Sequence, residues 1–188
     1  MTAGNSRDRE ATLAVLIRRE RPDDADAIRA VHEAAFDQPE LAGHPAPEAQ
    51  LVDELRIDGD AVPELSFVAE VDGEIVGHVV CSRATMRGRP SLGLGPIGVR
   101  PDVQGAGVGS ALMHAVIAAA DTLGEPAIVL LGHPDYYPRF GFEPAVEYGV
   151  RPPQPWGPSY FMVRRLTAWD PELAGAFRYA PAFERLDV

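Results

Sequence analysis

Residues 104–113 read QGAGVGSALM, in which three glycines at alternate positions lead directly into an apolar, alanine-rich segment. The apolar periodicity predicts a helix over residues 107–123, and PIGV at 96–99 predicts a strand before it. Backbone N–H groups at the start of a helix have no carbonyl partner and attract an anion, and glycine lets that anion approach the main chain. The stretch therefore predicts a strand–turn–helix unit that binds a negatively charged group.

The patterns on either side of this unit predict a mixed α/β fold. Two helices are expected early in the chain, over residues 21–36 and 45–56, and a short helix is expected within 133–144. Asp72-Gly73 is a strong hairpin signal between two of the expected strands. The strands are expected at residues 13–18, 65–71, 74–82, 91–99, 126–131 and 160–166.

Length and composition limit the classes of protein that the chain can belong to. The 188 residues predict one domain over residues 12–188, with a flexible tail at 1–11 and a C-terminal extension from about residue 167. No apolar segment is long enough to span a bilayer, and the N-terminus lacks a signal-peptide pattern, so no membrane partner is expected. The single Cys81 excludes an internal disulfide and favours the reducing cytoplasm.

The charged residues exclude several chemistries. The net charge is −11, whereas nucleic-acid binding needs clustered cations, so no nucleic-acid partner is expected. All 17 basic residues are arginine, which excludes a lysine nucleophile and the lysine of a P-loop. Neither the single cysteine nor the histidines have a metal-ligand spacing, so no bound metal is expected.

The glycine turn also departs from the dinucleotide-binding pattern. The third glycine of G-x-G-x-x-G is replaced by Ser110. Glu125 lies at about the distance of a ribose-binding carboxylate, but it precedes the next expected strand instead of following it. A dinucleotide-binding oxidoreductase is therefore a third interpretation.

A different motif matches fully. Gln104 to Gly109 match Q/R-x-x-G-x-G/A, which resembles the coenzyme A pyrophosphate loop of the GNAT N-acetyltransferase superfamily. YYPRFGF at 136–142 resembles the aromatic–Gly–Phe signature of that superfamily, and the resemblance covers roughly residues 13–166. LGPIGVRPDVQGAGVGSAL at 94–112 and RYAPAF at 178–183 further resemble a branch of predicted bacterial N-acetyltransferases.

The resemblance implies a fold and a co-substrate. It implies a mixed, mostly antiparallel central sheet, flanked by helices and splayed between its fourth and fifth strands, with acetyl-CoA as co-substrate. The pantetheine arm would pair with the main chain of the fourth strand, and an amide of Ile97 or Val99 would stabilise the oxyanion. Arg100 or Arg139 would add a cation at a phosphate, or would be a solvated surface residue. The residues implied in cofactor binding are Ile97, Gly98, Val99, Gln104, Gly105, Ala106, Gly107, Val108, Gly109 and Ser110.

The implied reaction is direct transfer of an acetyl group from acetyl-CoA to a primary amine. Tyr137 would be the general acid that protonates the CoA thiolate, with Tyr136 as the alternative. A histone-modifying branch has a glutamate base where this chain has Gly93, so that mechanism does not carry over. His133, Pro134 and Asp135 replace the asparagine that often follows the fifth strand. The remaining base candidates are Glu33, His78 and His133.

The acceptor is less constrained. The connection DQPELAGHPAPE at 37–48 carries Asp37, Glu40 and Glu48, which would favour a cationic amine or merely keep a loop solvated. We expect a small amine or a peptide as acceptor, and a homodimer remains open. The alternative function is a non-catalytic acyl-CoA-binding regulatory module, because no general base is evident.

Overall fold

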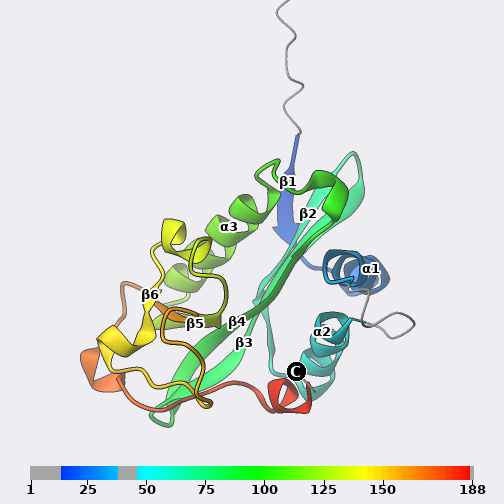
Figure 1. Ribbon diagram of the computed structural model, residues 1–188. Helices are drawn as coiled ribbons and strands as arrows, with labels where there is room; N and C mark the ends of the chain where they lie inside the picture. Colours follow the sequence, from blue (N-terminus) through cyan, green and yellow to red (C-terminus); the bar gives the residue numbers. More distant parts are fainter. Residues whose placement is uncertain (1–13, 38–45, 187–188) are drawn as a thin grey trace, which may run out of the picture.

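The computed structural model describes residues 14–37 and 46–186. Its eight strands form one sheet in the order β1-β2-β3-β4-β5-β7-β6, and β8 pairs with β3 (Figure 1). The strands are β1 (Leu16–Arg19), β2 (Ala61–Val71), β3 (Glu74–Met86), β4 (Arg89–Val99), β5 (Ala127–Leu131), β6 (Glu143–Pro144), β7 (Phe161–Arg165) and β8 (Phe177–Arg178). The α-helices are α1 (Ala25–Ala35), α2 (Pro47–Asp58) and α3 (Val108–Thr122).

Short 3-10 helices occupy several connections. They are η1 (Pro22–Asp24), η3 (Pro101–Val103), η4 (Tyr137–Phe140), η5 (Ala145–Tyr148), η6 (Pro171–Leu173) and η7 (Pro181–Arg185). The short helix expected within 133–144 is thus η4.

The sheet is antiparallel except between β4 and β5. These two strands pair in parallel at Leu92 with Ile128 and at Gly93 with Val129, and the ladder ends there. β4 nevertheless continues to Val99, so its last residues leave β5 while they remain paired with β3. The predicted fold class, mostly antiparallel and splayed between these strands, is confirmed.

Helices cover both faces of the sheet (Figure 1). α1 and α2 lie on one face, where Ile28 and Leu55 pack with Val68 and Val80. α3 lies on the other face, where Leu112 and other apolar residues of the helix pack into the largest core cluster. Full burial of such a side chain stabilises the fold by about 1.5–3 kcal/mol. The helices thereby hold the splayed end of β4 between two packed layers.

The central strands are longer than the sequence patterns predict. β2 begins at Ala61 instead of 65, and β3 extends to Met86 instead of 82. Arg87 and Gly88 connect β3 to β4 with φ angles of 51° and 75°. Arg-Gly is not among the usual hairpin signals, so the pattern did not reveal this turn. The two-residue strands β6 and β8 are too short to produce an alternating pattern.

The C-terminal segment returns to the sheet and to α2. β8 pairs with Thr85 and Met86 at the end of β3. Beyond it, η7 lies beside α2 (Figure 1), where Arg185 forms an ion pair with Glu54 at 2.7 Å. The predicted N-terminal tail at 1–11 lies outside the described residues, as does Glu40 of the predicted acceptor connection.

Candidate active site

A cavity of about 350 Å³ lies where β4 departs from β5. Six of the ten predicted cofactor-binding residues line this cavity, namely Ile97, Val99, Gln104, Gly105, Val108 and Gly109. Tyr136 and Tyr137 line it as well. The predicted residues Gly98, Ala106, Gly107 and Ser110 belong to the same strand and turn but are not part of the cavity lining.

The main chain of β4 turns polar groups toward this cavity. The N–H of Arg100 donates to Val76 of β3 at 2.8 Å, and N–H groups along a strand alternate in direction. The amides of Val99 and Ile97 therefore point away from β3, to the side where β5 has already separated. The carbonyl of Val99 points to the same side, because the side-chain amide of Gln104 donates to it at 2.8 Å.

The glycine turn presents a second group of backbone donors. Gly107 caps α3 with a φ of 87°, a backbone conformation that residues with a side chain rarely adopt. The N–H groups of Gln104 and Ala106 donate within the turn, to Pro101 and Val103. Within the described chain, the backbone N–H groups of Val108, Gly109 and Ser110 have no carbonyl partner, as expected for a first helical turn. They form the positive end of the α3 dipole, which favours an anion.

The two arginines considered as phosphate ligands both have protein partners. Arg100 pairs with Asp102 at 2.7 Å and with Glu74 at 3.2 Å. Arg139 lies over the ring of Tyr136, 4.9 Å from its centroid. The hydroxyl of Tyr136 lies 2.8 Å from where a Cβ atom at Gly109 would be, so the ring packs directly against the start of α3.

A second cavity, of about 760 Å³, meets the first at two residues. Ile97 and Tyr137 line both cavities. The larger one is also lined by apolar residues of the C-terminal segment and by Glu48 and Leu51 of α2. The two cavities therefore adjoin at Ile97 and Tyr137.

Tyr137 is mostly enclosed by protein. Its ring lies against Gly132 just after β5, where a Cβ atom would collide with it, and 6.0 Å from the ring centroid of Phe142. Burial, with a smaller effect from Tyr136, raises the pKa of Tyr137 to about 12. The phenol therefore keeps its proton at neutral pH and can act as a hydrogen-bond donor or acid.

The three predicted base candidates do not line either cavity. Glu33 is exposed on α1. His133 is also exposed, and its Nδ1 lies 3.6 Å from Oδ2 of Asp135. His78 is fully buried on β3. None of the three is therefore placed to take a proton from an acceptor directly, and His78 is instead part of the protein core.

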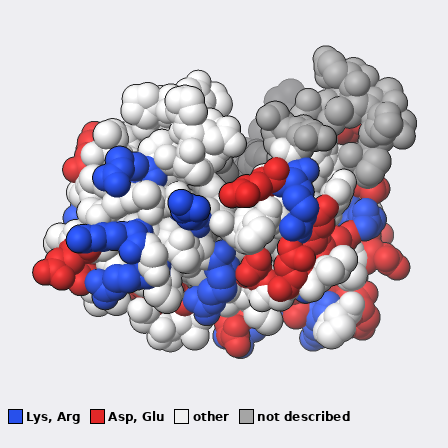
Figure 2. Space-filling view, turned by 90° about the horizontal axis from the view of Figure 1, so that it is seen from below, with Lys and Arg blue, Asp and Glu red and all other residues white. Residues whose placement is uncertain are grey.

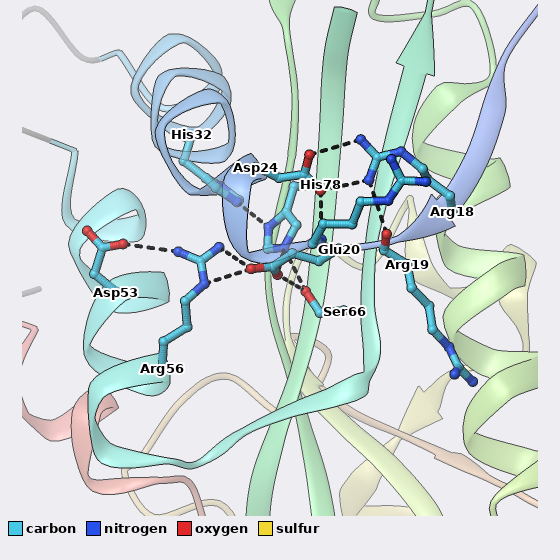
Figure 3. A network of polar contacts seen from close by, with 10 residues as sticks. Arg18, Arg19, Glu20, Asp24, His32, Asp53, Arg56, Ser66 and His78 are labelled. Atoms are coloured by element: carbon cyan, nitrogen blue, oxygen red, sulfur yellow. Dashed lines mark hydrogen bonds and ion pairs between the residues drawn. The ribbon is translucent and has the colours of Figure 1, made fainter. Parts of the chain in front are cut away.

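Figure 3 shows the buried polar network around His78. Nδ1 of His78 lies 2.8 Å from Nε2 of His32 on α1. Its Nε2 lies 2.9 Å from Oγ of Ser66 and 3.2 Å from Oε2 of Glu20. The Ser66 hydroxyl donates to Glu20, and the guanidinium of Arg56 on α2 pairs with the same carboxylate at 2.8 Å. Five elements or connections of the chain thus meet at one polar cluster.

One arrangement of protons satisfies this network with both histidines neutral. Nε2–H of His32 donates to Nδ1 of His78, and Nε2–H of His78 donates toward Ser66 and Glu20. Burial lowers the pKa of His32 to about 2, with smaller effects from His78 and Arg56. Nδ1 of His32 has no hydrogen-bond partner among the described residues. It lies 2.8 Å from where a Cβ atom at Gly98 would be, so only glycine fits there.

The structure also explains why the glutamate of the histone-modifying branch is absent. A Cβ atom at Gly93 would lie 2.7 Å from the ring of Tyr179. Tyr179 therefore fills the space into which a side chain at this position would extend. RYAPAF at 178–183 resembles a family segment, but no local pattern placed it at the site. Nor did a local pattern reveal Trp156 and Phe183, which line the larger cavity.

The described ranges, 14–37 and 46–186, contain neither a metal-ligand cluster nor a membrane-spanning helix. No three His, Cys, Asp or Glu side chains in these ranges are grouped as metal ligands would be. None of the helices in these ranges is long and apolar enough to span a bilayer.

Comparisons with known proteins agree with this geometry. A family model described as an acetyltransferase (GNAT) domain matches residues 63–144. The uncharacterized N-acetyltransferase YjhQ of Escherichia coli is 37% identical over 165 residues, which cover 84% of this chain and 87% of that protein. The uncharacterized N-acetyltransferase YhbS of Escherichia coli is 34% identical over 155 residues, covering 81% of this chain and 87% of YhbS.

Two solved structures are similar along nearly the whole chain. The crystal structure of YhbS in complex with CoA has a TM-score of 0.82 and 32% identity, covering 94% of this chain and 95% of that one. A GNAT family acetyltransferase from Brucella melitensis, in complex with acetyl-CoA, has a TM-score of 0.73 and 35% identity. The match covers 90% of this chain and 98% of that one. The chain therefore belongs to the GNAT family of acetyltransferases.

Proposed function

We propose that the protein binds acetyl-CoA in the smaller cavity and transfers the acetyl group to a primary amine that enters from the larger one. The observation that carries this proposal is the meeting of the two cavities at Ile97 and Tyr137. The complexes of two similar proteins with CoA and acetyl-CoA support the choice of co-substrate.

The unpaired backbone donors suit the parts of acetyl-CoA. The amides at the start of α3 would bind the pyrophosphate, and the free edge of β4 would pair with the pantetheine amides as an added strand does. The Ile97 or Val99 amide would donate to the thioester oxygen as negative charge develops on it. Acetyl-CoA supplies the activated acetyl group.

The transfer needs three proton movements. The acceptor ammonium must lose a proton before its nitrogen attacks the thioester carbon, and the C–S bond then breaks. Tyr137 would donate its phenolic proton to the departing sulfur, and its raised pKa keeps that proton available at neutral pH. The nitrogen loses a second proton as the amide forms, and this proton restores the Tyr137 phenol, while the proton lost first from the ammonium goes to solvent. The reaction therefore releases neutral CoA thiol, an N-acetylated amine and one proton.

The test is a thiol-release assay with acetyl-CoA and a panel of primary amines. We expect amine-dependent release of free thiol and an acetylated amine of the corresponding mass. Calorimetry with CoA in the same samples separates the alternatives. Binding of CoA without thiol release for any amine would favour the non-catalytic acyl-CoA-binding module, and absence of CoA binding would contradict both functions.

A cytoplasmic location remains a prediction from the sequence, which left a homodimer open. The free thiol of Cys81 is buried, which is consistent with a reducing compartment.

A further inference from the structure

The larger cavity has a chemical character of its own. Its volume of about 760 Å³ lies within the range of sites for small organic molecules. Its walls are largely apolar, made of leucine and proline residues together with the aromatic rings of Phe36, Trp156, Phe177, Tyr179 and Phe183. Such walls are best filled by an apolar, flat body, because rings stack on one another and release water from apolar surface.

One carboxylate in this cavity differs from its neighbours on the same helix. α2 carries four acidic residues, and three of them, Asp53, Glu54 and Asp58, form ion pairs with arginine. Glu48 forms no ion pair among the described residues, and its buried Oε2 has no hydrogen-bond partner there. Burial raises the pKa of Glu48. The carboxylate accepts from the Glu48 backbone N–H in the first turn of α2, but its buried Oε2 has no partner among the described residues. A buried carboxylate oxygen without a partner is unfavourable, and a bound cation would relieve that.

The wider charge distribution points in the same direction. Figure 2 shows acidic side chains gathered mostly over the half of the molecule that carries α1 and α2, with arginines among them. The other charged residues that line the cavity, Arg178 and Glu184, are exposed to solvent. Glu48 is thus the less solvated charge of the cavity, and its field would attract a cation.

We propose that the acceptor is a small primary amine on an aromatic body, whose ammonium group binds Glu48 while its ring occupies the aromatic cavity. This rests on the proposed function, since Glu48 lines the same cavity as Ile97 and Tyr137, between which the acetyl group would be transferred. Glu48 orients the amine, and the aromatic walls select its body.

An amine panel tests the substrate class. With saturating acetyl-CoA, thiol release is measured for 2-phenylethylamine and tryptamine, for putrescine, and for a lysine-containing peptide. We expect kcat/KM for the aromatic amines to exceed the others by about tenfold or more, because only they fill the apolar walls. Equal rates for all amines, or a preference for putrescine or the peptide, would overturn this proposal alone. No thiol release with any amine would overturn the proposed function as well.

The Glu48→Gln variant tests the ammonium contact, because it keeps the shape of the side chain and removes the charge. We expect KM for 2-phenylethylamine to rise about tenfold, with KM for acetyl-CoA unchanged. The matched control is Glu54→Gln, the same change on the same helix at a residue paired with Arg185. In the control, KM for 2-phenylethylamine and KM for acetyl-CoA should equal the wild-type values. An unchanged KM for the amine in Glu48→Gln would refute the contact.

A second measurement uses the unaltered protein. N,N-dimethyl-2-phenylethylamine is a cation that cannot form the product amide, and 2-phenylethanol is a neutral molecule of similar shape. We expect the cation to inhibit about tenfold more strongly than the alcohol, because only the cation pairs with Glu48. Equal inhibition would show that the ring alone is recognised and would overturn the proposed charge pairing.

Discussion

The adjacent residues Tyr136 and Tyr137 have different surroundings. Tyr137 packs against Gly132 after β5 and lines both cavities, whereas Tyr136 packs against Gly109 at the start of α3 and lines only the smaller one. Of the two, Tyr137 therefore lies where co-substrate and acceptor would meet. The pKa of Tyr136 is also raised by burial, partly offset by a hydrogen bond with Ser110.

We expect Tyr137→Phe to lower kcat by about a hundredfold, because a general acid contributes ~10²- to 10⁴-fold and water replaces it in part. KM for acetyl-CoA should change little, since the proton is needed only as the sulfur departs. The ring remains, so the unfolding temperature should stay the same. Steady-state kinetics and thermal unfolding provide the measurements.

Tyr136→Phe is the control for this prediction and should have the smaller effect on kcat. A wild-type rate in Tyr137→Phe, measured where chemistry limits turnover, would exclude the role. If Tyr136→Phe were the impaired variant, the acid would instead lie at the α3 side of the smaller cavity.

At the scale of elements, the start of α3 and the free edge of β4 form one binding surface. Both contribute backbone donors that have no partner in the described part of the chain, and Gln104 connects the turn to β4 through the Val99 carbonyl. Every residue except proline supplies a backbone N–H, so these donors do not depend on which side chain is present. Substitutions that leave the backbone intact therefore affect this surface mainly through charge.

Ala106 allows a test of the predicted anion site, because its side chain is exposed in the turn before α3. We expect Ala106→Glu to weaken CoA binding about tenfold, which is about 1.4 kcal/mol, through repulsion of the phosphates. Ala106→Arg should bind CoA at least as well as the wild type. Calorimetry at low and high salt gives the measurement, and the difference between the variants should shrink as salt screens the charges. Equal affinity of the two variants at low salt would place the phosphates elsewhere.

At the scale of the whole molecule, the buried network joins segments far apart in the chain (Figure 3). Glu20 follows β1, His32 lies on α1, Arg56 on α2, Ser66 on β2 and His78 on β3. The network thereby attaches both helices of one layer to the sheet. It holds its histidines neutral, because burial lowers the pKa values of His32 and His78.

This network predicts that stability falls on mild acidification. Below the ordinary His32 pKa of 6.5 the unfolded chain binds a proton, whereas folded His32 does not until pH falls to about 2. The unfolded state therefore binds more protons in this window, so the free energy of unfolding decreases as pH falls. At about pH 5, His32 lowers the free energy of unfolding by ~2 kcal/mol. His78 acts in the same direction, because its pKa is also lowered by burial.

Urea unfolding between about pH 8 and pH 5 measures this dependence. The carboxylates of Glu20 and Asp24 act mainly below this range, because they take up protons near pH 4.5 and 3.8 in the unfolded chain and at still lower pH in the folded protein, where their pKa values are lowered. His32→Gln should reduce the slope of stability against pH, whatever its absolute stability, and His133→Gln should leave the slope unchanged. An identical slope in His32→Gln would show that His32 already binds a proton in the folded protein.

The sequence by itself determined the features that depend on local pattern. The strand–turn–helix unit, with α3 observed at Val108–Thr122 against 107–123 predicted, follows from alternate glycines and apolar periodicity. The acetyltransferase family, and the sheet class that it implies, were predicted from a resemblance, because the glycine turn and the YYPRFGF signature are each an unbroken stretch of sequence. The absence of lysine excluded whole classes of chemistry without reference to any fold.

Only the tertiary structure decided the features that join distant residues. The contact of His32 with His78 spans 46 positions and that of Glu20 with His78 spans 58, so no local pattern encodes them. The aromatic cavity arises because Tyr179 and Phe183 return from the C-terminal segment to line the same space as Glu48 and Ile97. Burial and pairing depend on the packing of all neighbours at once, which is why His78 belongs to the core and Glu48 lies in a cavity without an arginine partner among the described residues.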